Sequence, residues 1–120
     1  MNDELTTRYE QAVTALGEVD LASPTAAVTS LTQARDAVQS ALDEAMAQAV
    51  TREGASLRQV AALAGIAPNS VSPRLARSAS LAAYSQDGRV DAQGITLARA
   101  DHQQDAPMRF VRRTSKGEQS

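Results

Sequence analysis

Apolar residues in the first part of the chain recur at three- and four-residue steps, the spacing that places side chains on one face of an α-helix. Over residues 3–16 the recurring positions are Leu5, Tyr9, Ala12, Val13 and Leu16. Asp3 can cap the start of such a helix, and Gly17 can end it. The pattern therefore predicts a first helix over residues 3–16.

A second, longer helix is predicted from Ser23-Pro24 to about Arg52. Serine suits the N-cap, and proline suits the first helical position because its missing N–H costs no hydrogen bond there. At 1.5 Å per residue this helix would be roughly 40 Å long. It either packs on the first helix as an antiparallel pair or pairs with its copy in a second subunit, and the sequence leaves both open. Its apolar stripe has nearly heptad spacing, is interrupted by Arg35, and comprises Val28, Leu31, Val38, Leu42, Ala45, Ala49 and Val50.

Two shorter helices are predicted after Gly54. The run Ser56-Leu57-Arg58-Gln59 matches a capping box, in which the serine and glutamine side chains each accept a hydrogen bond from the other residue's backbone N–H. A helix over 57–64 should follow and stop at Gly65. A further helix over 68–83 is then expected to begin at a proline.

The periodicity weakens after residue 84. Ser85-Gln86-Asp87-Gly88 is a turn signal. Asp91 can cap a short helix reaching about residue 102, although Gly94 inside it is unfavourable. The alternative is a hairpin in which 95–99 pairs with 108–112 to form a wing.

The composition favours the all-α class. Alanine makes up about a fifth of the chain, and aromatic residues number three. Alanine has a high helix propensity but buries little area, so we expect closely packed helices around a small core that dimerisation would enlarge. The predicted fold is a helical bundle in three parts: a long N-terminal helical pair for association (1–53), a central two-helix core (54–84), and a C-terminal short helix or wing with a basic tail (85–120).

The charge is distributed unevenly over the chain. Its net charge is −2, yet residues 1–50 carry eight acidic and two basic residues, a net of −6. Residues 51–86 carry four arginines and one glutamate, a net of +3, and residues 87–120 have a net of +1. An acidic first half and a basic centre are compatible with one surface that faces a polyanion.

The segment from Leu57 to Leu75 resembles the bacterial helix-turn-helix. The resemblance implies a small residue where two helices cross (Ala61) and a left-handed turn residue (Gly65). Val60, Ile66, Val71 and Leu75 would fill the wedge between the helices. The whole chain also looks like small actinobacterial helix-turn-helix DNA-binding proteins that are often associated with mobile elements. Such proteins are generally transcriptional regulators, but they include partition, transfer and excision factors.

Pro73 departs from the helix-turn-helix pattern. A proline inside a regular helix removes a hydrogen bond and clashes with the carbonyl four residues earlier, here that of Asn69, at a cost of about 3 kcal/mol. One interpretation keeps a bent helix that begins near Pro68, which we prefer. The other begins the helix at Pro73 with Ser72 as its cap.

The resemblance assigns roles to individual side chains. Recognition helices present their N-terminal residues to base edges in the major groove, which makes Asn69, Ser70, Ser72 and Arg74 the candidate base readers. Phosphate contacts position a protein on the duplex without reading sequence. The candidates for such contacts are Ser56, Arg58, Gln59, Arg77, Arg109, Arg112 and Arg113, with Arg52 as a weaker one.

Other functional classes have little support in the sequence. There is no cysteine and a single histidine, His102, so neither a thiolate nor a histidine-rich metal site is expected. No phosphate-binding loop, catalytic cluster, secretion signal or membrane-spanning segment is recognisable. We therefore expect a cytoplasmic, non-enzymatic protein without a cofactor.

Two functions from different classes remain. The first is sequence-specific binding of double-stranded DNA by a regulator that dimerises through residues 1–52. The second is an adaptor or assembly protein, or a partition- or excision-type accessory factor, whose N-terminal helices bind a protein partner. The acidic first half would be repelled by DNA and left available for that partner.

Overall fold

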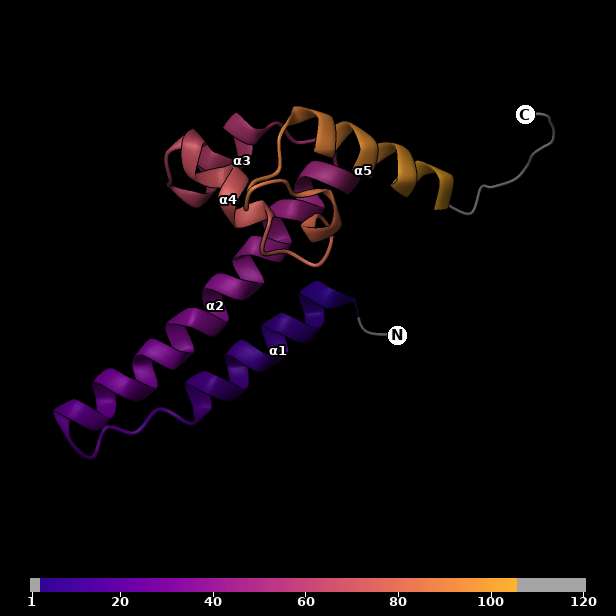
Figure 1. The fold of residues 1–120 in the computed structure, drawn as a ribbon. Helices are drawn as coiled ribbons and strands as arrows, with labels where there is room; N and C mark the ends of the chain where they lie inside the picture. The colour runs from indigo at the N-terminus through magenta and orange to yellow at the C-terminus, as the bar shows by residue number, and fades with distance from the viewer. Residues whose placement is uncertain (1–2, 106–120) are drawn as a thin grey trace, which may run out of the picture.

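A computed structural model describes residues 3–105, and this part of the chain is all-helical without a strand, as the sequence predicts. Figure 1 shows α1 and α2 lying side by side as an arm, with the remaining helices gathered into a head around one end of α2. The molecule is elongated, measuring 65 × 33 × 24 Å. The elements in order are α1 (Glu4–Gly17), α2 (Pro24–Arg52), α3 (Leu57–Ala64), the 3₁₀ turn η1 (Pro68–Ser70), α4 (Val71–Leu75), the 3₁₀ turn η2 (Ala82–Tyr84) and α5 (Ala92–Asp105).

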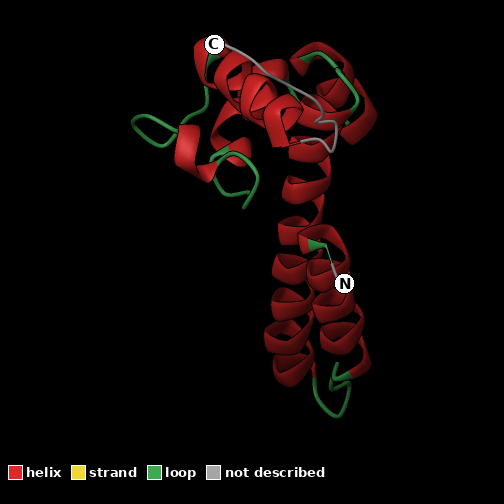
Figure 2. Cartoon of the chain, turned by 90° about the vertical axis from the view of Figure 1, so that its right-hand side faces the viewer, coloured by secondary structure: helices red, strands yellow, loops and turns green. Residues whose placement is uncertain are grey.

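The arm is an antiparallel helical pair, one of the two arrangements that the sequence left open (Figure 2). The Ser23 side chain caps α2 by accepting from the N–H of Ala26, and Pro24 takes the first helical position. The connecting loop is fixed by Ser30, whose hydroxyl accepts from the N–H of Asp20 at 3.0 Å. Both predicted boundaries of the long helix are confirmed.

Small residues form the contact between the two helices of the arm. Ala12 and Ala34 are the buried residues there, at 5% and 2% exposure. Arg8 joins the arm to the head, because its guanidinium donates to the carbonyl oxygens of Ser40 at 3.1 Å and Arg77 at 3.3 Å. Most of the larger apolar side chains of the arm remain exposed.

The core lies in the head and is built around the C-terminal half of α2. Burial of the apolar side chains that form this core supplies the main stabilisation of the head. Leu75 and Leu81 are fully buried, and Arg99 of α5 ties the end of α2 to the core by donating to the carbonyl oxygens of Val50 (3.0 Å) and Ala55 (3.1 Å). The core comprises Met46, Ala47, Val50, Val60, Ala61, Val71, Leu75, Leu81, Val90, Ile95 and Ala98.

The prediction of one helix over residues 68–83 is wrong, because α4 ends at Leu75. Beyond that residue, buried side chains accept hydrogen bonds from some of the backbone N–H groups that a longer helix would have used. Glu44, fully buried on α2, accepts from the N–H of Ala79 at 2.8 Å and from the hydroxyl of Ser80 at 2.5 Å. The buried Ser78 hydroxyl accepts from the N–H of Leu81 at 3.0 Å. The chain therefore follows α2 as a series of turns.

The C-terminal region contains a helix rather than a wing. The predicted turn is present, with Asp87 and Gly88 both at positive φ, and Asp91 caps α5 by accepting from the N–H of Gly94 at 2.9 Å. Residues 95–99 are helical, so they are not the first strand of a hairpin. The other proposed strand, 108–112, and the basic tail lie outside the described residues.

Gly94, which weakens the helix prediction, is required by packing. A Cβ at this position would lie 2.7 Å from the carbonyl oxygen of Tyr84, well inside van der Waals contact. The backbone of α5 can therefore approach η2 only because residue 94 has no side chain.

Gly94→Ala should lower the free energy of unfolding by about 1–3 kcal/mol, because the overpacking outweighs the gain in helix propensity. Gly17→Ala is the matched control, since nothing lies within 4 Å of its added Cβ, and it should be neutral or slightly stabilising. Urea unfolding followed by circular dichroism measures both. Equal stability of the two variants would contradict the close approach.

Candidate nucleic-acid interface

α3 begins and ends where its local sequence dictates. The Ser56 hydroxyl accepts from the N–H of Gln59 at 3.0 Å, and the Gln59 side chain accepts from the N–H of Ser56 at 2.8 Å, so the predicted capping box is confirmed. Gly65 ends the helix in the left-handed conformation, with φ of 72°. The first-turn N–H groups of a helix lack intrahelical partners and favour anions, which gives this end of α3 a capacity for phosphate.

The turn after α3 places α4 against it. The N–H of Ile66 donates to the carbonyl of Ala61 at 3.0 Å, closing the turn around Gly65. Ala61 is 1% exposed, so a larger side chain would separate the two helices. Val60, Val71 and Leu75 are buried in the core, and Ile66 packs against it.

Pro73 is accommodated because it lies in the first turn of α4. Val71 is the first residue of this helix, so Pro73 occupies the third position, where a backbone N–H has no intrahelical acceptor. The preceding Pro68–Ser70 turn is 3₁₀. This geometry agrees with a helical element that begins irregularly at Pro68, and the alternative start at Pro73 is wrong.

The four candidate base readers separate into two groups. Asn69 and Ser70 are exposed at the start of the second helical element, where side chains can reach a ligand. Ser72 is half-buried, and its carbonyl accepts from the N–H of Val90 at 3.2 Å. Arg74 is directed into the protein, where its Nε lies 2.6 Å from Asp43 Oδ1.

The position of Arg74 corrects its predicted role. Its side chain is 19% exposed and that of Asp43 is 4% exposed, so the pair is largely shielded from water. Removing the arginine from this pair would leave a buried carboxylate without its partner, which is costly. We therefore assign Arg74 to the attachment of α4 to α2 and remove it from the base-reading set.

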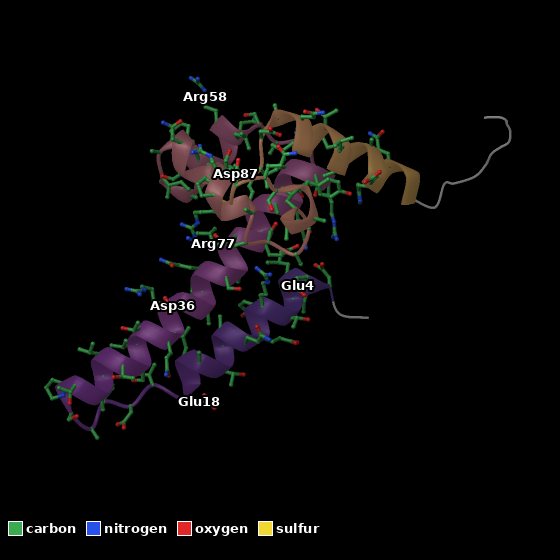
Figure 3. The ribbon with its side chains drawn as sticks, viewed as in Figure 1. Glu4, Glu18, Asp36, Arg58, Arg77 and Asp87 are labelled. Carbon is green, nitrogen blue, oxygen red and sulfur yellow. The ribbon has the colours of Figure 1, made fainter. Side chains whose placement is uncertain are left out.

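The candidate phosphate contacts do not form one cluster. Figure 3 shows Arg58 at the end of the head farthest from α1, whereas Arg77 lies where the head meets α2. Ser56 and Gln59 border Arg58, although their side chains also serve the capping box. Arg109, Arg112 and Arg113 lie outside the described residues.

The centre of the chain is less cationic than its composition indicates. Arg74 is neutralised by Asp43, and Arg52 lies 3.6 Å from Asp3. The exposed arginines without an ion pair to another described residue are Arg58, Arg77 and Arg89.

Arg89 was missed by the sequence analysis. It follows the tight Asp87-Gly88 turn, and the next residue is hydrogen-bonded to Ser72 of α4, so the turn places the backbone of Arg89 close to Ser72. The Asp-Gly pair predicts the turn, but only the long-range bond to α4 reveals this position.

The described residues offer little for other chemistry. Within residues 3–105 no three histidine or acidic side chains gather in a way that could hold a metal ion. In the same range no helix has both the length and the apolar character needed to cross a bilayer. In comparisons with known proteins, no family model, no curated protein and no solved structure matches the chain.

Arg74→Ala should lower the free energy of unfolding by about 2–3 kcal/mol, because it strands the Asp43 carboxylate. Arg35→Ala is the control: Arg35 pairs with Asp36 at 3.2 Å, but both side chains are 63% exposed. Its loss should cost less than about 0.5 kcal/mol. Urea unfolding of both variants measures the difference. An Arg74 variant as stable as the Arg35 variant would return Arg74 to the candidate reading set.

Proposed function

We propose that this chain binds double-stranded DNA, with α3 as the positioning helix and the η1–α4 element as the reading element of a cytoplasmic regulator. The observation that supports this most is the agreement of four positions in one register. Ser56 caps α3, Ala61 is buried at the helix contact, Gly65 is left-handed, and Val71 is buried in the wedge.

The reading residues in this proposal are Asn69 and Ser70, with Ser72 at the edge. Asparagine can form two hydrogen bonds to adenine in the major groove, and serine can bond to several bases. Arg58 and the N-terminus of α3 would contact phosphate on one side of the reading element, and Arg89 would contact it on another. Arg77 is a weaker candidate because it lies near the acidic arm.

The dependence of the binding constant on salt concentration reports the number of phosphates that the protein contacts. Each phosphate neutralised changes the logarithm of the binding constant by about −0.9 per tenfold rise in salt. Arg58 and Arg89 therefore predict a slope of about −2 per protomer from the head alone. A much steeper slope would have to come from residues 106–120, and Arg109, Arg112 and Arg113 are the cations to replace in testing that.

The experiment begins by selecting bound duplexes from a random pool and measuring affinity for the selected sequence as a function of salt. Arg58→Ala should weaken binding of all duplexes alike and reduce the slope by about 1. Asn69→Ala should instead relax the preference at one base pair, costing about 1–3 kcal/mol there. Gln33→Glu, at an exposed position of the arm, changes the net charge by the same amount as Arg58→Ala and is the matched control, so it should leave both quantities unchanged.

Two results would count against the proposal. One is failure to enrich any duplex together with salt-independent binding of random DNA. The other is a Gln33 variant as impaired as the Arg58 variant, since the loss of binding would then follow from net charge and not from a contact of the head. The alternative function, assembly with a protein through the N-terminal helices, has its own structural support in the exposed apolar side chains of the arm.

A further inference from the structure

The arm buries its small side chains and exposes its large ones. The contact between α1 and α2 is made by alanines such as Ala12 and Ala34, whereas larger apolar residues stay exposed at 45–66%. A stable isolated pair would bury the larger residues, because the hydrophobic gain grows with the area removed from water. The exposed set is Tyr9, Val13 and Leu16 of α1 and Val28, Leu31 and Val38 of α2.

These residues lie on one face, which follows from the helical register. The inner row of α1 includes the buried and half-buried positions Arg8, Ala12 and Ala15. Each exposed apolar residue of α1 follows one of them by one residue, as Val13 follows Ala12. The inner row of α2 includes Ala27, Ser30 and Ala37, and each exposed apolar residue of α2 again follows one of them, as Leu31 follows Ser30. One residue corresponds to a rotation of about 100°. Because the helices are antiparallel, equal shifts in sequence turn both rows toward the same side of the arm.

The opposite side of the arm is polar. Most positions that precede the inner rows by one residue are glutamine, threonine, serine or an acidic residue. The arm is therefore amphipathic across its thickness, with one apolar and one polar side. The polar positions are Gln11, Thr14 and Glu18 on α1 and Gln33, Asp36 and Ser40 on α2.

The apolar side continues into the head. The α2 row passes from Val38 to Leu42, Ala45 and Ala49, which line a groove of about 240 Å³ beside α3. Leu63 of α3 also lines this groove and is 85% exposed. We call this continuous surface, from Leu16 and Val28 to Leu63, the apolar face. Exposed apolar surfaces larger than roughly a few hundred Å² mark interaction sites.

We propose that the apolar face binds a second copy of this chain about a two-fold axis, so that the two arms form a four-helix bundle. Its dimensions suit this partner. The 29 residues of α2 give a length of about 40 Å, and the 14 residues of α1 lie along about 20 Å of it. With each helix about 10 Å wide, the arm presents about 600 Å², the low end of what each subunit contributes to a standard stable interface.

Chemistry also favours an identical partner. The α2 row is nearly heptad, a pattern that packs against a similar row by inserting side chains between those of the other helix. Arg35 is the one charged position within it, and its guanidinium is paired with Asp36 at 3.2 Å. The face carries no acidic residue that would select a basic partner. Two identical apolar faces can bury each other when two copies pack about a two-fold axis.

Sedimentation equilibrium of the full chain without DNA tests the pairing independently of the proposed DNA binding. The wild type should be a dimer at micromolar concentration. Leu31→Glu and Val13→Glu, one on each helix, should each raise the dimer dissociation constant about a hundredfold or more, because each buries a charge without a partner. Gln33→Glu and Thr14→Glu add the same charge on the polar side and should leave it unchanged. Circular dichroism verifies that all variants remain helical.

A monomeric wild type at these concentrations would overturn the pairing, and so would a dimer that survives both face variants. The pairing would also be overturned if the polar-side variants raised the dimer dissociation constant as much as the apolar-face variants do. The added charge alone, and not its position on the apolar face, would then explain the dissociation. Loss of DNA binding by a variant that remains dimeric would bear on the proposed function and not on this interface.

Discussion

The head depends on a buried carboxylate. Glu44 is fully buried on α2 and accepts hydrogen bonds from the backbone N–H of Ala79 and the hydroxyl of Ser80, with further support from Gln48 at 3.0 Å. The adjacent Asp43 holds Arg74. These neighbouring acids attach α4 and the chain that follows it to two sides of one helix. Neither acid can lose its partners cheaply, because burial makes an unsatisfied charge expensive.

The attachment to α2 determines what the candidate interface can present. With Arg74 directed inward and Leu75 buried, the short second element keeps its exposed residues at its start, in the Pro68–Ser70 turn. The η1–α4 element is thus held by the ion pair of Arg74 with Asp43 and by the hydrogen bond between Ser72 and Val90. Ordering of this element before binding reduces the entropy lost when a ligand is bound.

The features that the sequence predicted well are set by neighbouring residues. The Ser23 and Ser56 caps, the left-handed Gly65 and the Asp87-Gly88 turn each follow from a few adjacent side chains, so the limits of α2 and α3 could be derived. The end of α4 and the role of Arg74 could not, because they depend on Asp43 and Glu44, which lie more than thirty residues away in the chain. The periodicity of α2 likewise could not tell which of its two apolar rows faces α1.

The exposure of Asn69 and Ser70 has a consequence for how the protein can change over time. Their side chains form no hydrogen bond to another described residue, and neither belongs to the core. Most substitutions at such surface positions alter stability by less than about 0.5 kcal/mol. The scaffold can therefore remain constant while these two positions vary, because substitutions there leave the fold undamaged.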